Sequence, residues 1–138
     1  MIKAETIIKR ADIYLSINNN RELKDKFLEK YSKCEVLCRP FLQDYLKSIG
    51  EYIPDEDIGM ELDLIKDALS DAGYTFDDDD KLLTRIWGKG KTKGSSSCRF
   101  LRNKISHELM ERALHEVVER NVELNADMDK FIGTLSSN

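Results

Sequence analysis

The chain has 138 residues, of which 41% are apolar, and carries a formal net charge of −4 at pH 7. This size is typical of one globular domain, and seven glycines and two prolines are too few for a turn-rich β architecture, so we expect a single all-α domain over residues 1–138. The sequence has no apolar run of about 18 residues to span a bilayer and no apolar stretch of a signal peptide near its charged N-terminus, so we expect a cytoplasmic protein without a membrane partner.

Apolar residues recur at three- and four-residue spacing in the first half of the chain, which predicts helices. The first helix covers residues 2–17 and stops at the three asparagines of residues 18–20. A second helix follows, and Pro40 should kink it or start a new one, because proline donates no backbone hydrogen bond and clashes with the preceding turn. A third helix over residues 57–72 should end at Gly73, a glycine in the C′ position.

The three cysteines are an odd number in a chain without a secretion signal, which favours reduced thiols over a disulfide framework. Cys34 and Cys38 lie four residues apart on the second predicted helix, and we interpret them as half-buried small hydrophobic side chains. A metal half-site is the alternative, but the sequence has no second cysteine or histidine pair at ligand spacing. We therefore expect neither a metal nor another cofactor.

Four aspartates, residues 77–80, precede a short predicted helix. Carboxylates at a helix N-terminus accept hydrogen bonds from its free N–H groups and complement the macrodipole, so a cap is favoured over a cation site. The lysine-rich, flexible sequence of residues 88–97 should form a mobile loop, followed by a long helix over residues 97–121 and a last helix over residues 127–135. About five helices with short connections predict an up-and-down bundle whose neighbouring helices are antiparallel.

The sequence GKGKT in that loop, residues 88–92, is similar to the end of a phosphate-binding loop. The first glycine of that motif would fall at Arg85, and no strand precedes it, so a nucleotide site of this type is disfavoured. Lysines on glycine-rich backbone can instead follow a phosphate backbone without reading base sequence. The alternative is a surface loop whose charge serves solubility.

Charge is unevenly distributed along the chain. Residues 51–80 contain twelve carboxylates and one lysine, whereas residues 81–107 contain eight cations and no carboxylate. The eight cations are Lys81, Arg85, Lys89, Lys91, Lys93, Arg99, Arg102 and Lys104. This basic segment suits an anionic partner such as nucleic acid. The alternative is that the acidic and basic segments neutralise each other, within one molecule or across a dimer.

His107 follows this cluster, and histidine is the side chain that can most readily give or take a proton near neutral pH. Asn103 precedes it by four residues and should share its helix face, whereas Arg102 is five residues away, about 140° around an ideal helix. A long arginine side chain, or a second copy in a two-fold dimer, would still bring a guanidinium to the imidazole.

Two strips of side chains are expected along the long helix. The strip expected to face the core is Leu101, Ile105, Leu109, Ala113 and Val117. His107 lies off that strip, beside Asn103, Met110 and Leu114. A partly apolar strip with polar residues at its start suits a subunit contact that lines a cleft.

The sequence LRNKISHE, residues 101–108, resembles the R-x4-6-H signature of the HEPN superfamily (higher eukaryotes and prokaryotes nucleotide-binding domains). Arg102, Asn103 and His107 match its arginine, the polar residue that follows it, and its histidine, in the form with four intervening residues. In that family the motif lies toward the start of a late helix of a four- or five-helix bundle, which is also the expected layout here.

The resemblance implies metal-independent RNA cleavage, as in toxins with antitoxin partners, abortive-infection proteins and CRISPR-associated ribonucleases, at a composite site across a homodimer. It implies that His107 acts as acid or base, that Arg102 stabilises charge on the phosphate, and that Asn103 orients one of them. The side chains expected to hold the RNA are Lys89, Lys91, Lys93, Arg99 and Lys104. The alternative is a catalytically inactive dimerisation, binding or regulatory module, since mannitol-repressor-like regulators carry a similar run of residues.

Overall fold

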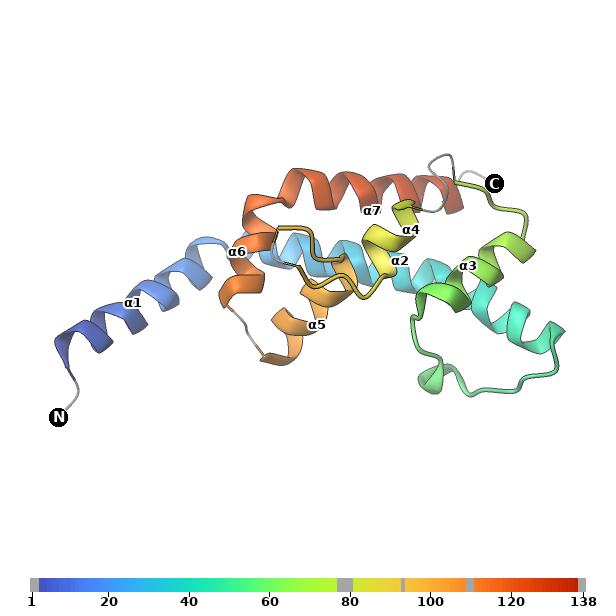
Figure 1. Ribbon diagram of the computed structural model, residues 1–138, viewed down its shortest axis with the longest axis horizontal. Helices are drawn as coiled ribbons and strands as arrows, with labels where there is room; N and C mark the ends of the chain where they lie inside the picture. The colour runs from blue at the N-terminus through green and yellow to red at the C-terminus, as the bar shows by residue number, and fades with distance from the viewer. Residues whose placement is uncertain (1–2, 77–80, 93, 109–110, 137–138) are drawn as a thin grey trace.

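The computed structural model describes residues 3–76, 81–92, 94–108 and 111–136, apart from the side chains of residues 12–19 and 107–108. Its helices are α1 (Ala4–Asn19), α2 (Arg21–Ser48), the 3-10 turn η1 (Asp55–Asp57), α3 (Leu62–Asp71), α4 (Lys81–Trp87), α5 (Cys98–Glu108), α6 (Glu111–Glu119) and α7 (Asn121–Ser136) (Figure 1). The expected all-α fold is confirmed, although the described residues form seven α-helices and not about five.

Helix α2 is the longest element and the centre of the fold (Figure 1). Its 28 residues span about 42 Å at about 1.5 Å per residue. Helices α3, α5, α6 and α7 all pack against it. Its buried face repeats at three- and four-residue intervals and consists of Phe27, Tyr31, Cys34, Cys38, Leu42 and Leu46. The apolar period of the sequence thus predicts which side of α2 the other helices cover.

Helix α2 continues through Pro40, so the expectation that a new helix starts at this proline is wrong, while the alternative expectation of a kink stays a prediction. The proline ring deprives the carbonyl of Val36 of its helical hydrogen-bond donor. Both Pro40 and Val36 are exposed, so water can satisfy that carbonyl. The buried apolar face of α2 continues from Cys38, before the proline, to Leu42, after it. Its burial stabilises the continuous helix and offsets the missing backbone hydrogen bond.

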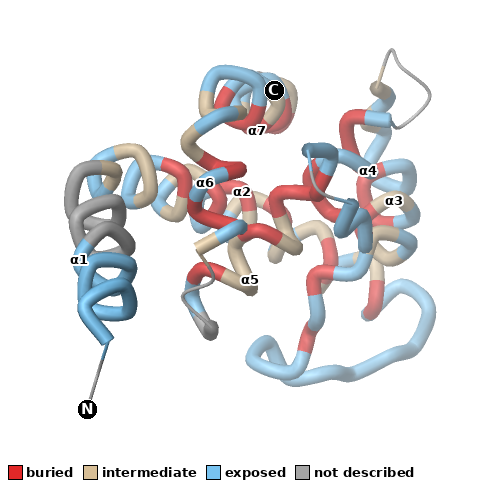
Figure 2. The backbone as a smooth tube through the Cα atoms, turned by 60° about the vertical axis from the view of Figure 1, so that its left-hand side comes forward, coloured by how far each residue is buried: buried red, intermediate tan, exposed pale blue. Residues whose placement is uncertain are grey.

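An aromatic cluster joins α2, α4 and α7. Trp87, the last residue of α4, is fully buried. Its ring centroid lies 5.3 Å from that of Tyr31 in α2 and 5.6 Å from that of Phe131 in α7, in tilted and edge-to-face arrangements that favour aromatic pairs. Figure 2 shows the buried residues gathered where α2, α4, α5, α6 and α7 face one another. The cluster therefore fixes the end of α4, where residues 88–97 begin, on the core.

All three cysteines are free thiols and fully buried, which exceeds the half burial expected for Cys34 and Cys38. Burial raises the pKa of Cys34 to about 12 and raises the pKa of Cys38 and of Cys98 further. These thiols therefore stay protonated at neutral pH, and they act as small core side chains without the reactivity of a thiolate.

Helix α1 extends away from the body of the protein (Figures 1 and 2). It ends at Asn19, within the asparagine run where the first helix was expected to stop. Ile7 and Ile8 are 55% and 61% exposed. The apolar spacing of this segment therefore predicts the helix correctly, but these two side chains do not join the core of this chain.

The long helix expected over residues 97–121 is two helices, α5 and α6, with residues 109–110 outside the described part of the chain. The last helix is longer than the expected residues 127–135, since α7 begins at Asn121. Both α5 and α6 pack against α2, and the change of direction between them (Figure 1) brings the apolar face of each onto the core. This packing explains why a straight helix is not formed.

The core strip expected along residues 97–121 is confirmed wherever its side chains are described, and Leu109 lies outside that part. Its buried members are Leu101, Ile105, Ala113 and Val117. Leu114, expected at a subunit contact, is only 4% exposed and is buried in its own chain, so that expectation is wrong for this residue. Met110, expected beside it, is outside the described residues.

Helix α3 ends as its sequence predicts. Gly73 has a φ of 91° and donates to the carbonyl of Ser70, while the N–H of Tyr74 donates to the carbonyl of Leu69. This pair of hydrogen bonds is the Schellman arrangement, and its positive φ favours glycine. The expected capping role of residues 77–80 falls outside the described residues.

Gly88→Ala should destabilise the fold by about 1–3 kcal/mol, the usual cost of forcing extra atoms into a packed site. A Cβ at Gly88 would lie 2.5 Å from the backbone carbonyl oxygen of Thr84, which cannot move without disturbing α4. Urea denaturation of both variants measures the effect, with Gly90→Ala as the control, because a Cβ there meets its nearest atom at 3.6 Å. Equal stabilities of the two variants would contradict the close packing at Gly88.

Candidate functional site

The basic segment between α4 and α5 is closed by Ser97. The hydroxyl of Ser97 donates to the carbonyl of Gly88 over 2.7 Å and accepts from the N–H of Phe100 over 3.1 Å. The N–H of Ser97 donates to the carbonyl of Gly90 over 2.8 Å. Ser97 is therefore the N-cap of α5 and also holds the end of α4 beside it.

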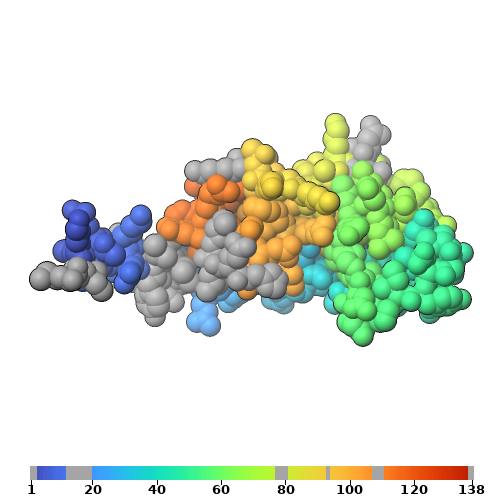
Figure 3. All heavy atoms as spheres, turned by 60° about the horizontal axis from the view of Figure 1, so that its bottom comes forward, coloured from blue at the N-terminus to red at the C-terminus, as the bar shows by residue number. Residues whose placement is uncertain are grey.

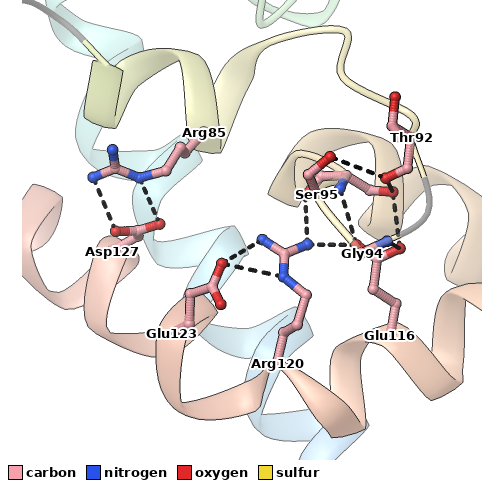
Figure 4. Close-up of polar contacts among 9 residues, drawn as sticks. Arg85, Thr92, Gly94, Ser95, Glu116, Arg120, Glu123 and Asp127 are labelled. Carbon is pink, nitrogen blue, oxygen red and sulfur yellow. Dashed lines mark hydrogen bonds and ion pairs between the residues drawn. The ribbon is translucent and has the colours of Figure 1, made fainter.

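A buried carboxylate of α6, that of Glu116, anchors the second half of this segment (Figure 4). It accepts hydrogen bonds from the N–H of Gly94 over 3.2 Å and from the N–H of Ser96 over 3.0 Å. The hydroxyl of Ser96 lies 2.9 Å from Glu116 Oε1. Glu116 is only 5% exposed, so few water molecules compete for these bonds.

Arg120, one turn further along the chain, completes this anchor (Figure 4). Its Nη1 forms an ion pair with Glu116 and donates to the carbonyl of Ser96 over 2.9 Å. Its Nη2 donates to Glu123 Oε1 over 2.8 Å. Within the loop expected to be mobile, Gly94 and Ser96 are thus hydrogen-bonded to Glu116 or Arg120; Lys93 lies outside the described residues.

The hydrogen bonds around Glu116 set its ionisation. Burial of the carboxylate raises its pKa, but hydrogen bonds from Gly94, Ser96 and Arg120 outweigh burial, and the pKa of Glu116 lies below its ordinary value. For Arg120, burial opposes the charge, but Glu123 and Glu116 leave its pKa raised. Both groups are therefore charged at neutral pH.

An open groove lies between this loop and the first turns of α5. It has a volume of about 390 Å³ and is lined by Gly88, Lys89, Lys91, Arg99, Phe100, Asn103 and Lys104. Four of these residues are cations, so the groove attracts anions. Four of the five residues expected to hold RNA therefore lie together; the fifth, Lys93, is outside the described residues.

The described part of the acidic segment, residues 51–76, contributes no residue to the lining of this groove. Figure 3 shows residues 88–92 and 94–97 beside α5 in the middle of one face, with residues 51–76 gathered toward one end. Asp55 pairs with Arg39 of α2, with 3.7 Å between Nη1 and Oδ1. Arg85 makes a two-pronged pair with Asp127 of α7, at 3.0 and 3.2 Å (Figure 4). These ion pairs link Asp55 to α2 and Arg85 to α7.

The arginine and asparagine of the motif are in direct contact. Arg102 Nη1 donates to Asn103 Oδ1 over 3.0 Å. Arg102 also turns toward α2, where its Nη2 lies 3.8 Å from Glu35 Oε1 and its guanidinium carbon lies 5.7 Å from the ring centroid of Tyr31. Asn103 thus lines the groove, whereas Arg102 forms a bridge from the motif to α2.

The remaining member of the motif, His107, lies in the last turn of α5, four residues after Asn103. Its side chain is outside the described part of the structure, so its distance from Arg102 stays a prediction. The motif was expected near the start of a long helix, but the histidine is the penultimate residue of an 11-residue helix. His115 on α6 is half exposed and lies 3.7 Å from Glu111.

Two contributors to this site were missed from the sequence. Glu116 stands directly before Val117 and three residues after Ala113, so a carboxylate on the apolar face of an amphipathic helix was the signal that could have identified it. Phe100 carries no comparable signal, because an aromatic residue in the first turn of an amphipathic helix is usually part of the core.

The described residues contain no group of three or more His, Cys, Asp or Glu side chains that could hold a metal ion. None of the described helices combines the length and apolar character that crossing a bilayer requires. Comparison with protein-family models, curated proteins and solved structures finds no match for the chain. The functional argument therefore rests on the geometry of the groove.

Glu116→Gln should lower the free energy of unfolding at pH 7 by about 1.5–3 kcal/mol, the range for hydrogen bonds to a charged group. Because the pKa of Glu116 is lower in the folded state, its stabilisation is complete above the ordinary glutamate pKa of about 4.3 and is lost as pH falls through the folded-state value. The gap between wild type and variant should therefore be constant well above the ordinary glutamate pKa of about 4.3 and shrink as the pH falls below that value.

Urea denaturation at each pH measures this gap, and Glu119→Gln, an exposed neighbour on α6, is the matched control with a change below about 0.5 kcal/mol. A gap that stays constant with pH would show that the carboxylate charge of Glu116 does not stabilise the fold.

Proposed function

We propose that this chain is a metal-independent endoribonuclease of the HEPN type, acting in the cytoplasm as a toxin or phage-defence component. The observation that carries the proposal is the groove in which Asn103 of the motif lies with Lys89, Lys91, Arg99 and Lys104. A groove of this charge holds phosphates, and it adjoins the helix that carries the whole R-x4-6-H sequence.

The proposed reaction is cleavage by the neighbouring 2′-hydroxyl of the RNA. The 2′-oxygen loses its proton to a base and attacks the phosphorus, while the 5′-oxygen leaves with a proton from an acid, giving a 2′,3′-cyclic phosphate and a 5′-hydroxyl. His107 is the proton-transferring group, and Arg102 stabilises the charge on the pentacoordinate phosphate. Asn103 accepts from Arg102 through Oδ1, which leaves its amide N–H groups to donate to a phosphate oxygen or to the imidazole.

A homodimer would complete this site by bringing two copies of the motif to one cleft. Arg102 supports the need for a second copy, because in one chain its guanidinium contacts Glu35 and Tyr31 of α2. In the proposed dimer, a phosphate competes with Glu35 for the guanidinium. An antitoxin or other protein partner would regulate the enzyme.

The second candidate is a catalytically inactive helical module that binds an anionic or protein partner. The same contacts of Arg102 favour it, because an arginine held by a carboxylate and an aromatic ring stabilises the packing of α5 on α2 without any catalytic role. RNA cleavage by the purified protein separates the two candidates.

Purified protein should cut single-stranded RNA in the presence of EDTA and leave 2′,3′-cyclic phosphate ends. His107→Ala should lower the cleavage rate by about 10²–10⁴-fold, the usual contribution of a general acid or base. His115→Ala is the matched control, since this half-exposed histidine on α6 matches no position of the motif, and it should leave the rate unchanged. Gel analysis of end-labelled RNA measures both rates.

Circular dichroism and urea denaturation would show whether His107→Ala keeps the fold. Absence of cleavage by folded wild type on any RNA tested, with binding retained, would exclude the nuclease and leave the binding module. A cleavage rate that Arg102→Lys leaves unchanged would contradict the proposed role of the forked guanidinium.

RNA binding in the groove should weaken steeply with salt. Each lysine that neutralises a phosphate on single-stranded nucleic acid contributes about 0.7 to the slope of log affinity against log salt. The combined change of Lys89, Lys91 and Lys104 to glutamine should therefore reduce this slope by about 2, as measured by fluorescence anisotropy between 50 and about 300 mM salt. Lys130→Gln, an exposed lysine on α7, is the control, and an equal slope for both variants would exclude the groove as the RNA site.

A further inference from the structure

Phe100 is the one aromatic side chain among the described residues that line the groove, and it stands among cations. It is partly buried: the ring packs against the hydrophobic core and also forms part of the groove wall. Its backbone N–H donates to the hydroxyl of Ser97 over 3.1 Å, which holds it in the first turn of α5. The helix cap therefore holds the backbone of Phe100, and packing against the core holds its ring.

Lys104 lies one helical turn after Phe100, and its Nζ is 5.7 Å from the centroid of the Phe100 ring. An ammonium group at this distance is attracted to the negative face of the ring. A polar group on the groove side can therefore reach the ring. A planar base can replace the ammonium group of Lys104 on the face of the Phe100 ring. The displaced ammonium group can then bind a phosphate oxygen of the same nucleotide.

The cations around the ring are placed to hold the phosphates of such a nucleotide. Lys89 and Lys91 reach the groove from the loop, and Arg99 and Lys104 reach it from α5. Stacking of bases on aromatic side chains between backbone-binding cations is the general means by which proteins hold single strands without reading sequence. A duplex cannot use it, because its bases are stacked on one another inside the helix.

We propose that Phe100 is a stacking platform for one unpaired base and that the groove selects single-stranded nucleic acid over duplex. The inference rests on the proposed function in that it assumes nucleic acid in the groove, but it does not depend on cleavage. The competing account is a groove that binds any polyanion through charge alone.

Binding of two 12-residue probes tests the proposal by fluorescence anisotropy. One is 2′-O-methyl oligouridylate, which cannot be cut because it lacks the free 2′-hydroxyl, and the other is an abasic ribose-phosphate strand of equal charge. Wild type should bind the base-bearing probe about tenfold more tightly, given the usual strength of base stacking on an aromatic ring. A base-paired form of the uridylate should bind no better than the abasic strand.

Phe100→Leu keeps an apolar side chain against the core and should reduce the preference for bases to near onefold, with affinity for the abasic strand unchanged. Phe100→Trp should retain the preference, and its new indole fluorescence should change with the base-bearing probe alone. If Phe100→Leu fails to fold, the proposal is tested by the relative affinity of wild type for the two probes and by the fluorescence change of Phe100→Trp.

Equal binding of both probes by wild type, or a preference that survives folded Phe100→Leu, would overturn the platform while leaving an anion-binding groove. Wild type that binds neither probe would overturn the platform and the nucleic-acid function together.

Discussion

One buried carboxylate holds the second half of the loop that borders the basic groove. Glu116 accepts the N–H groups of Gly94 and Ser96 and pairs with Arg120, so its charge is solvated by donors of the protein in place of water. An unpaired charge at this depth would cost several kcal/mol, on the order of the penalty for any buried ion. The backbone N–H groups of the loop therefore stabilise the buried charge of Glu116. The same hydrogen bonds hold Gly94 and Ser96 against α6.

The core fixes the other side of the groove. Trp87 packs between Tyr31 and Phe131, and this packing fixes the position of the end of α4, where the loop begins. Ser97 caps the N-terminus of α5 beside it. The guanidinium of Arg102 also lies over the ring of Tyr31. One patch of α2 therefore supports both the loop that bears the lysines and the arginine of the motif, which explains how packing far from solvent shapes the proposed RNA site.

Features that depend on local sequence could be predicted, and features that depend on packing could not. Gly73 ends α3 because a positive φ and two nearby hydrogen bonds need only adjacent residues. Pro40 was expected to kink α2 or to start a new helix, and no new helix starts there, because solvent at an exposed carbonyl and a continuous buried stripe are properties of the folded chain. The anchoring of the loop by Glu116 joins residues about 20 positions apart, which periodicity cannot reveal.

Amide hydrogen exchange at Gly94 and Ser96 in the free protein tests most directly whether the groove is preformed by this carboxylate. Both amides should exchange on the order of 100-fold more slowly than in an unstructured peptide, and Glu116→Gln should abolish that protection while the amides of α2 stay protected. Exchange of Gly94 and Ser96 in wild type at the rate of an unstructured peptide would contradict the account.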